Sequence, residues 1–248
     1  MSRYLIEVAY NGKNYAGFQI QKNANTIQAE VQNALEVCLR RPFELTGSSR
    51  TDAGVHALQN FFHFDSENLP ERGGSNQYKK LLYSLNSVLP GDIMVRGVRP
   101  VNADFHARFS AVSREYRYGV YKQKNPFYQT TAYYYPYPVE ISVLESAAKI
   151  LLLTRDFTAF SKRNTQVNNF FCTLYKSEWK MENDLLVYNV AGNRFLRGMV
   201  RGMVGTMLKA ASGKILLNEF KEIIESKDCT RANFAVPPNG LFLRKVNY

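Results

Sequence analysis

The chain has 248 residues, 45% of them hydrophobic, which is enough to bury one large core or two of ordinary size. Its 32 Lys and Arg residues against 21 Asp and Glu residues leave a formal net charge of +11, and this excess favours a polyanionic partner. Three scattered cysteines and the lack of any long apolar run argue against a disulfide framework, a zinc site and a membrane span, so a cytoplasmic protein is expected.

The positive charge is concentrated in the second half of the sequence. Residues 1–105 contain 11 basic and 10 acidic residues, which leaves 21 basic and 11 acidic residues for 106–248, or +10 of the total of +11. Sixteen Tyr and sixteen Phe residues are interleaved with these charges. Aromatic rings stack on unpaired bases while Arg and Lys hold phosphates, so RNA is favoured over duplex DNA.

Hydrophobic periodicity in residues 1–105 predicts the order strand, helix, strand, strand, helix, strand. Alternating apolar and polar residues indicate the strands, and apolar residues spaced three or four apart indicate the helices. The strands are expected at 4–10, 43–46, 57–64 and 93–98, the helices at 27–41 and 78–88, and a flexible loop at 69–77. This order is typical of a split βαβ unit, in which helices cover one face of a largely antiparallel sheet.

A second unit of the same kind is predicted for residues 106–248. Its strands are expected at 112–121, 170–181, 185–190 and 241–247, and its helices at 141–151, 195–208 and 217–226. The fold class is therefore expected to be α+β, with one N-terminal domain at 1–105 and one C-terminal domain at 106–248. Both would be RNP-like, with the helices on one sheet face and an RNA-binding cleft on the other.

The segment from Gly47 to His56, between two predicted strands, is the first candidate for chemistry. Small residues surround Arg50 and Asp52 in it, so the backbone can bend sharply and a large planar ligand can approach closely. Asp52 is the preferred candidate for a reactive group. The alternative is that Asp52 only closes a turn and pairs with Arg50.

The second candidate segment is the helix expected at 195–208. Its apolar residues form a core stripe, and Arg194, Arg197 and Arg201 are expected to cluster on a different face. Gly198, Gly202 and Gly205 on the same helix favour close packing of another element. Their spacing inside a helix does not fit a dinucleotide-binding fingerprint.

Other chemistries have little support in the sequence. His56, His63 and His106 have no metal-ligand spacing, so structural roles and no metal are expected. The sequence contains neither a GxSxG nucleophile elbow nor a cysteine paired with a plausible histidine motif. A carboxylate, arginines and tyrosines remain as candidates.

Six motifs, in the same order along the chain, resemble those of tRNA pseudouridine synthases of the TruA type. They are Arg50-Thr-Asp-Ala-Gly-Val-His56, Arg114-Glu-Tyr-Arg-Tyr118, Asn125-Pro-Phe127, Asp156-Phe-Thr-Ala-Phe160, Phe195-Leu-Arg-Gly-Met-Val-Arg201 and Pro237-Pro-Asn-Gly-Leu241. The resemblance covers essentially the whole chain. It implies isomerisation of uridine to pseudouridine at nucleotides 38–40 of the tRNA anticodon arm by a homodimer without a metal or organic cofactor.

The resemblance also implies roles for five residues. Asp52 is similar to the catalytic aspartate, and Arg50 to the basic residue that helps displace the target base. Tyr116 resembles the tyrosine that stacks on uracil, Arg201 the arginine that pairs with the aspartate, and Leu241 the apolar residue that closes the pocket. Two other readings remain open, a non-catalytic RNA-binding module and a purely structural pairing of Asp52.

Overall fold

The structure is a computed structural model that describes residues 1–67, 69, 77–163 and 167–248. The described chain divides into two compact units, Met1–Val112 with Leu243–Tyr248, and Ser113–Phe242. This division differs from the expected boundary after Phe105 in two places. The connection 106–112 belongs to the first unit, and so do the last six residues, because the chain returns to the first unit at its end.

The first unit contains a largely antiparallel sheet with two helices. Its central strand β1 (Ser2–Tyr10) pairs with β3 (His56–Ser66) on one side and β4 (Ile93–Val101) on the other. The short strand β2 (Thr46–Gly47) also pairs with β3, and β9 (Leu241–Asn247) is another neighbour of β3. Together with the helices, the order β1, α1, β2, β3, α2, β4 confirms the predicted split βαβ arrangement.

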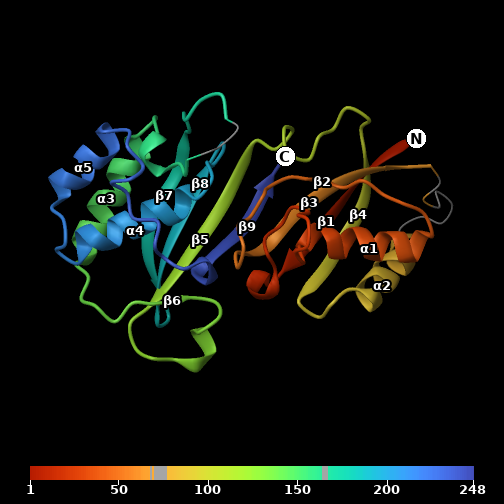
Figure 1. The fold of residues 1–248 in the computed structure, drawn as a ribbon, viewed down its shortest axis with the longest axis horizontal. Helices are drawn as coiled ribbons and strands as arrows, with labels where there is room; N and C mark the ends of the chain where they lie inside the picture. The colour runs from red at the N-terminus through yellow and green to blue at the C-terminus, as the bar shows by residue number, and fades with distance from the viewer. Residues whose placement is uncertain (68, 70–76, 164–166) are drawn as a thin grey trace. The chain divides into compact units, whose positions relative to one another are not determined.

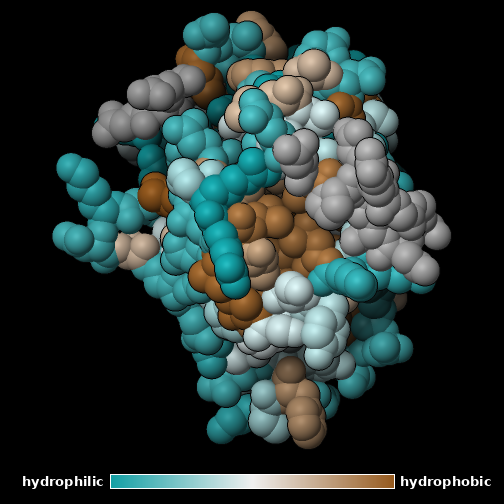
Figure 2. Space-filling view, turned by 90° about the vertical axis from the view of Figure 1, so that its right-hand side faces the viewer, coloured by the Kyte–Doolittle hydropathy of each residue, from teal (hydrophilic) through white to brown (hydrophobic). Residues whose placement is uncertain are grey.

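The two helices of the first unit are α1 (Ile27–Leu39) and α2 (Gln77–Val88), which pack against each other (Figure 1). Thr26 caps α1 by accepting a hydrogen bond from the Ala29 amide. The predicted loop 69–77 lies almost wholly outside the described residues. Figure 2 shows the side of the molecule that carries these helices, where apolar residues gather in a hollow bordered by hydrophilic ones.

The strand expected at 43–46 is reduced to β2, and side chains of α1 explain the difference. The Glu36 carboxylate accepts a hydrogen bond from the Phe43 amide at 3.3 Å, and the Gln28 amide donates one to the Leu45 carbonyl at 2.8 Å. These backbone groups are therefore satisfied by the helix and need no strand partner. The prediction of a strand over all of 43–46 was wrong.

In its described residues, the second unit has three main strands and three helices. Strand β5 (Ser113–Tyr121) pairs antiparallel with β8 (Leu185–Gly192), β8 pairs antiparallel with β7 (Leu174–Glu182), and the short β6 (Tyr133–Tyr134) runs parallel to β5. The helices are α3 (Ile141–Leu153), α4 (Met199–Ala211) and α5 (Leu217–Glu225). Helix α3 packs on β7 and on both other helices. Both units are therefore α+β, as predicted.

Helix α4 begins four residues later than expected, at Met199. Gly198 precedes it with φ of 74°, a left-handed conformation that ends the preceding loop and that glycine adopts readily. Arg194 and Arg197 therefore lie before the helix, and only Arg201 is on it. The prediction of a clustered arginine face on one helix was wrong.

The glycines of α4 have the predicted packing role. A Cβ atom at Gly205 would lie 2.1 Å from the Asn233 carbonyl oxygen, and one at Gly202 would lie 2.7 Å from the Phe234 ring. The segment around 233–234 thus runs directly against the helix, where a larger residue would collide with backbone. This contact positions the chain that leads to residues 236–241. None of the described helices is both long and apolar enough to cross a membrane.

Candidate active site

The segment Gly47–His56 links β2 to β3 and presents two charged side chains. Arg50 is exposed and Asp52 is half-buried, whereas the residues next to them, Ser49 and Thr51, are buried. The Arg50 guanidinium makes no hydrogen bond or ion pair with any residue in the described part of the chain. A buried backbone thus carries an outward-pointing cation next to a carboxylate.

Backbone hydrogen bonds fix the course of this segment. The Phe18 amide donates to the Thr51 carbonyl at 3.1 Å, and the Val55 amide closes a turn by donating to the Asp52 carbonyl at 3.2 Å. Gly17 has φ of 114°, and a Cβ atom there would lie 3.2 Å from the same Thr51 carbonyl oxygen. Glycine is therefore required at position 17 for residues 16–18 to approach the turn at Asp52.

His56 has a structural contact at the end of the segment. Its buried ring accepts a hydrogen bond from the Gly12 amide at Nδ1, at 3.1 Å, so Nδ1 carries no proton in this arrangement. A Cβ atom on Gly12 would lie 2.0 Å from the Val55 carbonyl oxygen. Within the described residues, no group of three or more His, Cys, Asp or Glu side chains is placed to hold a metal ion.

The remaining predicted site residues belong to the second unit. Tyr116 lies on β5, half-buried, with its ring edge-on to Phe195 at a centroid distance of 5.0 Å. Phe195 lies in the loop before α4, in the motif that ends at Arg201. The aromatic motif of β5 and the arginine motif are thus in direct contact.

Arg201 and Leu241 are connected through the segment between them. The Arg201 guanidinium donates to the Val236 carbonyl from Nε at 2.9 Å and to the Phe234 carbonyl from Nη2 at 3.4 Å. Five residues after Val236, the buried Leu241 begins β9. Arg201 therefore holds the chain that leads into the predicted pocket-closing residue.

Tyr118 anchors the same segment from the sheet. Its hydroxyl donates to the Pro237 carbonyl at 2.7 Å, and a Cβ atom on Gly240 would lie 2.8 Å from its ring. Burial raises the pKa of Tyr118, so the hydroxyl stays protonated and can donate at any physiological pH. The segment that leads into Leu241 is thus held by Arg201 at residues 234 and 236 and by Tyr118 at residue 237.

The model of the tRNA pseudouridine synthase family matches residues 6–110 and 147–248. The chain belongs to this family. The matched residues include Arg50, Asp52, Arg201 and Leu241, whereas Tyr116 lies in the interval 111–146 that the model does not match.

Named tRNA pseudouridine synthases are similar over their whole length. The tRNA pseudouridine synthase A of Parabacteroides distasonis is 41% identical over 248 residues, which cover 100% of this chain and 96% of that protein. That of Bacteroides thetaiotaomicron is 40% identical, with 100% and 91% covered. That of Staphylococcus aureus strain MRSA252 is 37% identical, with 98% and 91% covered. Like the rest of the family, the chain is an isomerase.

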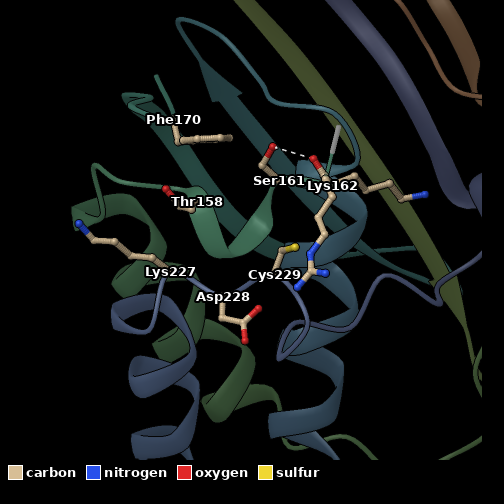
Figure 3. A pocket seen from close by; sticks show the side chains of 8 residues that line it. Thr158, Ser161, Lys162, Phe170, Lys227, Asp228 and Cys229 are labelled. Carbon is tan, nitrogen blue, oxygen red and sulfur yellow. Dashed lines mark hydrogen bonds between the residues drawn. The ribbon is translucent and has the colours of Figure 1, made fainter. Parts of the chain in front are cut away.

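This pseudouridine synthase also has a polar pocket that the sequence did not indicate as a site. The pocket, of about 430 Å³, lies in the second unit; it is lined by Thr158, Ser161, Lys162, Arg163, Phe170, Lys227, Asp228 and Cys229. In Figure 3, Lys162 and Lys227 extend to opposite sides of it. The Lys162 amide donates to the Arg197 carbonyl at 3.0 Å, so the pocket adjoins the loop before α4. One lining residue, Thr158, lies in the motif Asp156–Phe160, but that motif gave no indication of a pocket.

His63 and His106 support the connection 102–112. His63 Nδ1 accepts a hydrogen bond from the Ala107 amide at 3.1 Å, and its ring lies 4.8 Å from that of His106. Burial and the nearby positive charge of Arg3 lower the pKa of His63 to about 4. Both histidines act as neutral acceptors for backbone amides, since His106 Nδ1 accepts from Arg108 and Phe109.

A loss of stability at mildly acidic pH is expected from His63. Its pKa is lowered in the folded protein, so its contribution is complete above the unfolded value near 6.5 and is lost as the pH falls towards 4. Between pH 7 and pH 5 this should cost about 1–2 kcal/mol, after a discount for residual solvent at the ring. Urea denaturation of the wild type and of His63→Asn, which keeps an acceptor without titrating there, measures the difference. Equal pH dependence in the two proteins would refute this role.

Proposed function

We propose that the chain isomerises uridine to pseudouridine at nucleotides 38–40 of the tRNA anticodon arm, as a cytoplasmic homodimer. The observation that carries the proposal is the Arg50–Asp52 segment, in which a fixed, mostly buried backbone presents a cation and a carboxylate. It occurs in a chain that belongs to the tRNA pseudouridine synthases. The similarity to named tRNA pseudouridine synthases A over whole chains supports the same substrate class.

The reaction requires a site that holds a detached base. The bond from N1 of uracil to C1′ of ribose breaks, the base turns, and C5 bonds to C1′ while C5 loses a proton and N1 gains one. Asp52 is the proposed catalytic residue, and attack on the sugar, attack on the ring and removal of a ribose proton are all compatible with a carboxylate there. Aromatic and apolar walls around the base would exclude water during the turn.

The other residues have proposed roles in holding the substrate. The target uridine must leave its stack, and Arg50, exposed and without a partner among the residues that the structure describes, is suited to take its place or to hold the displaced strand. We assign Tyr116 to stacking on the uracil, Arg201 to pairing with Asp52, and Leu241 to closing the pocket. The first unit thus supplies the catalytic segment, and the basic second unit completes the RNA-binding cleft.

Binding of tRNA should depend strongly on salt, and mainly on the second half of the chain. Residues 106–248 hold +10 of the +11 net charge, and each neutralised phosphate should add roughly 0.7 to 0.9 to the slope of log affinity against log salt. Reversal of Lys122 and Lys124, or of Lys162 and Arg163, should therefore weaken binding to every tRNA alike. Filter-binding titrations at several salt concentrations measure the slope.

A lysine pair in the first unit provides the matched control for these reversals. Lys79 and Lys80 are both exposed on α2, and their reversal changes the net charge equally. We expect it to leave the salt slope nearly unchanged. A reversal of Lys79 and Lys80 that weakened binding as much as one in the second half would show that net charge alone matters.

Tyr116→Ala is expected to separate turnover from affinity. A ring that stacks on one base contributes little to total tRNA affinity but orients the base that reacts. Single-turnover rates at saturating enzyme should fall more than the affinity does. If binding were lost while bound tRNA still reacted at the normal rate, Tyr116 would be a peripheral contact.

A further inference from the structure

A buried asparagine on β3 is bonded to the catalytic segment. Asn60 is fully buried, and its amide Nδ2 donates to the Ser49 carbonyl at 2.9 Å and to the Tyr10 hydroxyl at 3.1 Å. Its Oδ1 accepts from the Phe61 amide at 2.9 Å. Both hydrogens of the amide group are thus used, and this fixes which end of the side chain faces Ser49.

Tyr10 extends the network to the other side of Arg50. The Tyr10 hydroxyl, on β1, lies 2.8 Å from Thr51 Oγ1 in a buried hydrogen bond. Ser49 directly precedes Arg50, and Thr51 lies between Arg50 and Asp52. The two central strands of the first unit therefore hold the residue on each side of Arg50, Ser49 at its backbone carbonyl and Thr51 at its side-chain hydroxyl.

Asparagine is an unusual residue at position 60, because its neighbours on this side of β3 are aromatic. Phe62 and Phe64 follow Asn60 at every second position of β3, so all three side chains point to the same side of the strand. Both phenylalanines are buried in the aromatic core, where the Phe62 ring stacks on that of Phe18 at a centroid distance of 4.5 Å. An amide among such side chains is costly unless every polar atom is paired. Asn60 is fully paired, and its partners lie in the catalytic segment and next to it.

We propose that Asn60, together with Tyr10, is a positioning residue for the isomerisation, which aligns Arg50 and Asp52 through the Ser49 carbonyl and the Thr51 hydroxyl. The inference rests on the proposed function, because it needs Asp52 to act on the uridine. Asn60 touches neither substrate nor reacting atoms. It acts by restricting the orientation of the segment, so it should affect turnover of bound tRNA more than tRNA affinity.

The decisive variant is Asn60→Asp, which keeps the shape of the side chain but replaces the donor by an oxygen. Burial raises the pKa of a carboxyl group at this position, so the test extends to pH values of about 9, where the ionised group opposes the Ser49 carbonyl and the segment should shift. We expect single-turnover rates on bound tRNA to fall by about 10- to 100-fold, with the affinity for tRNA changed less than about threefold. A protonated carboxyl can donate again, so the rate relative to wild type should recover as the pH is lowered. The titratable side chain that is hydrogen-bonded to the Asn60 amide is that of Tyr10.

Asn86, at an exposed position in the same unit, supplies a control for the change from amide to carboxyl. Its side chain also bonds to backbone, donating to the Val95 carbonyl at 2.9 Å and accepting from the Val95 amide at 2.8 Å, but it is not bonded to the catalytic segment. Asn86→Asp should lower the melting temperature without changing the rate on bound tRNA. Tyr10→Phe serves as the second variant, should Asn60→Asp fail to fold, and is expected to slow bound-tRNA turnover about tenfold.

Three results distinguish a positioning role of Asn60 from a purely structural role and from failure of the proposed function. Slowed turnover in Asn60→Asp or Tyr10→Phe, with affinity kept and with partial recovery at low pH for Asn60→Asp, supports the positioning role. Wild-type turnover in folded Tyr10→Phe and in folded Asn60→Asp throughout the pH range, or equal losses in Asn86→Asp, overturns it. The proposed function fails by a different result, full activity of Asp52→Asn, so the two failures can be told apart.

Discussion

Asp52→Asn is expected to bind tRNA normally and to form no detectable pseudouridine. The substitution keeps the side-chain shape, and the turn that holds this position depends on the Asp52 carbonyl, which is unchanged. Loss of a reacting group typically reduces turnover by about 10⁴-fold or more, far beyond what a shift in packing causes. Release of tritium from C5-labelled uridine in tRNA measures the rate, and gel-shift titration measures binding.

Asp104→Asn is the matched control, because Asp104 is an exposed carboxylate in the same unit and its replacement changes the net charge equally. It should react at the wild-type rate. A folded Asp52→Asn protein with turnover within about tenfold of wild type would remove Asp52 from the catalytic role.

Arg201→Ala is expected to produce the second-largest loss, about 10²- to 10³-fold in turnover of bound tRNA. Two causes contribute, since the guanidinium is the proposed partner of Asp52 and also holds the Val236 and Phe234 carbonyls. Arg201→Lys should recover little, because a single ammonium group cannot reproduce the forked contacts. Guanidinium ion added to Arg201→Ala should restore part of the rate.

A double-mutant cycle separates pairing with Asp52 from support of the backbone. If the two residues act as a pair, Asp52→Glu and Arg201→Ala should be strongly non-additive, so the double variant is little slower than the slower single variant. Effects that multiply independently would refute the pairing and leave Arg201 with its role in holding residues 234–236.

Most helices and strands were predictable because the spacing of apolar residues that indicates them is a local property of the sequence. Ile27, Val31, Ala34 and Leu35 recur at helical spacing, and they are the buried face of α1. The start of α4 was not predictable in the same way, because the apolar stripe continues through Phe195 and Leu196, while the backbone is turned at Gly198. The strand expected at 43–46 was replaced by bonds to side chains of α1, and periodicity carries no information about such bonds.

The site was predictable to the extent that its chemistry lies within one short segment. Small residues around Arg50 and Asp52 indicated a tight backbone, and the structure has one. The supports of that segment come from Gly12, Gly17, Tyr10 and Asn60, and the amide of Asn60 and the hydroxyl of Tyr10 meet across 50 positions in sequence. A contact between residues so far apart in sequence depends on the register of β1 and β3, which a single sequence does not specify.

The most direct test of the proposed function is to incubate the purified protein with unmodified tRNA, without any additive, and to map pseudouridine along the product. A tRNA with uridines at positions 38, 39 and 40 and elsewhere serves as substrate, and carbodiimide labelling followed by primer extension locates each modified nucleotide. We expect pseudouridine at positions 38–40 and at no other uridine. Folded, tRNA-binding protein that forms no pseudouridine, or forms it only outside the anticodon arm, would contradict the proposal.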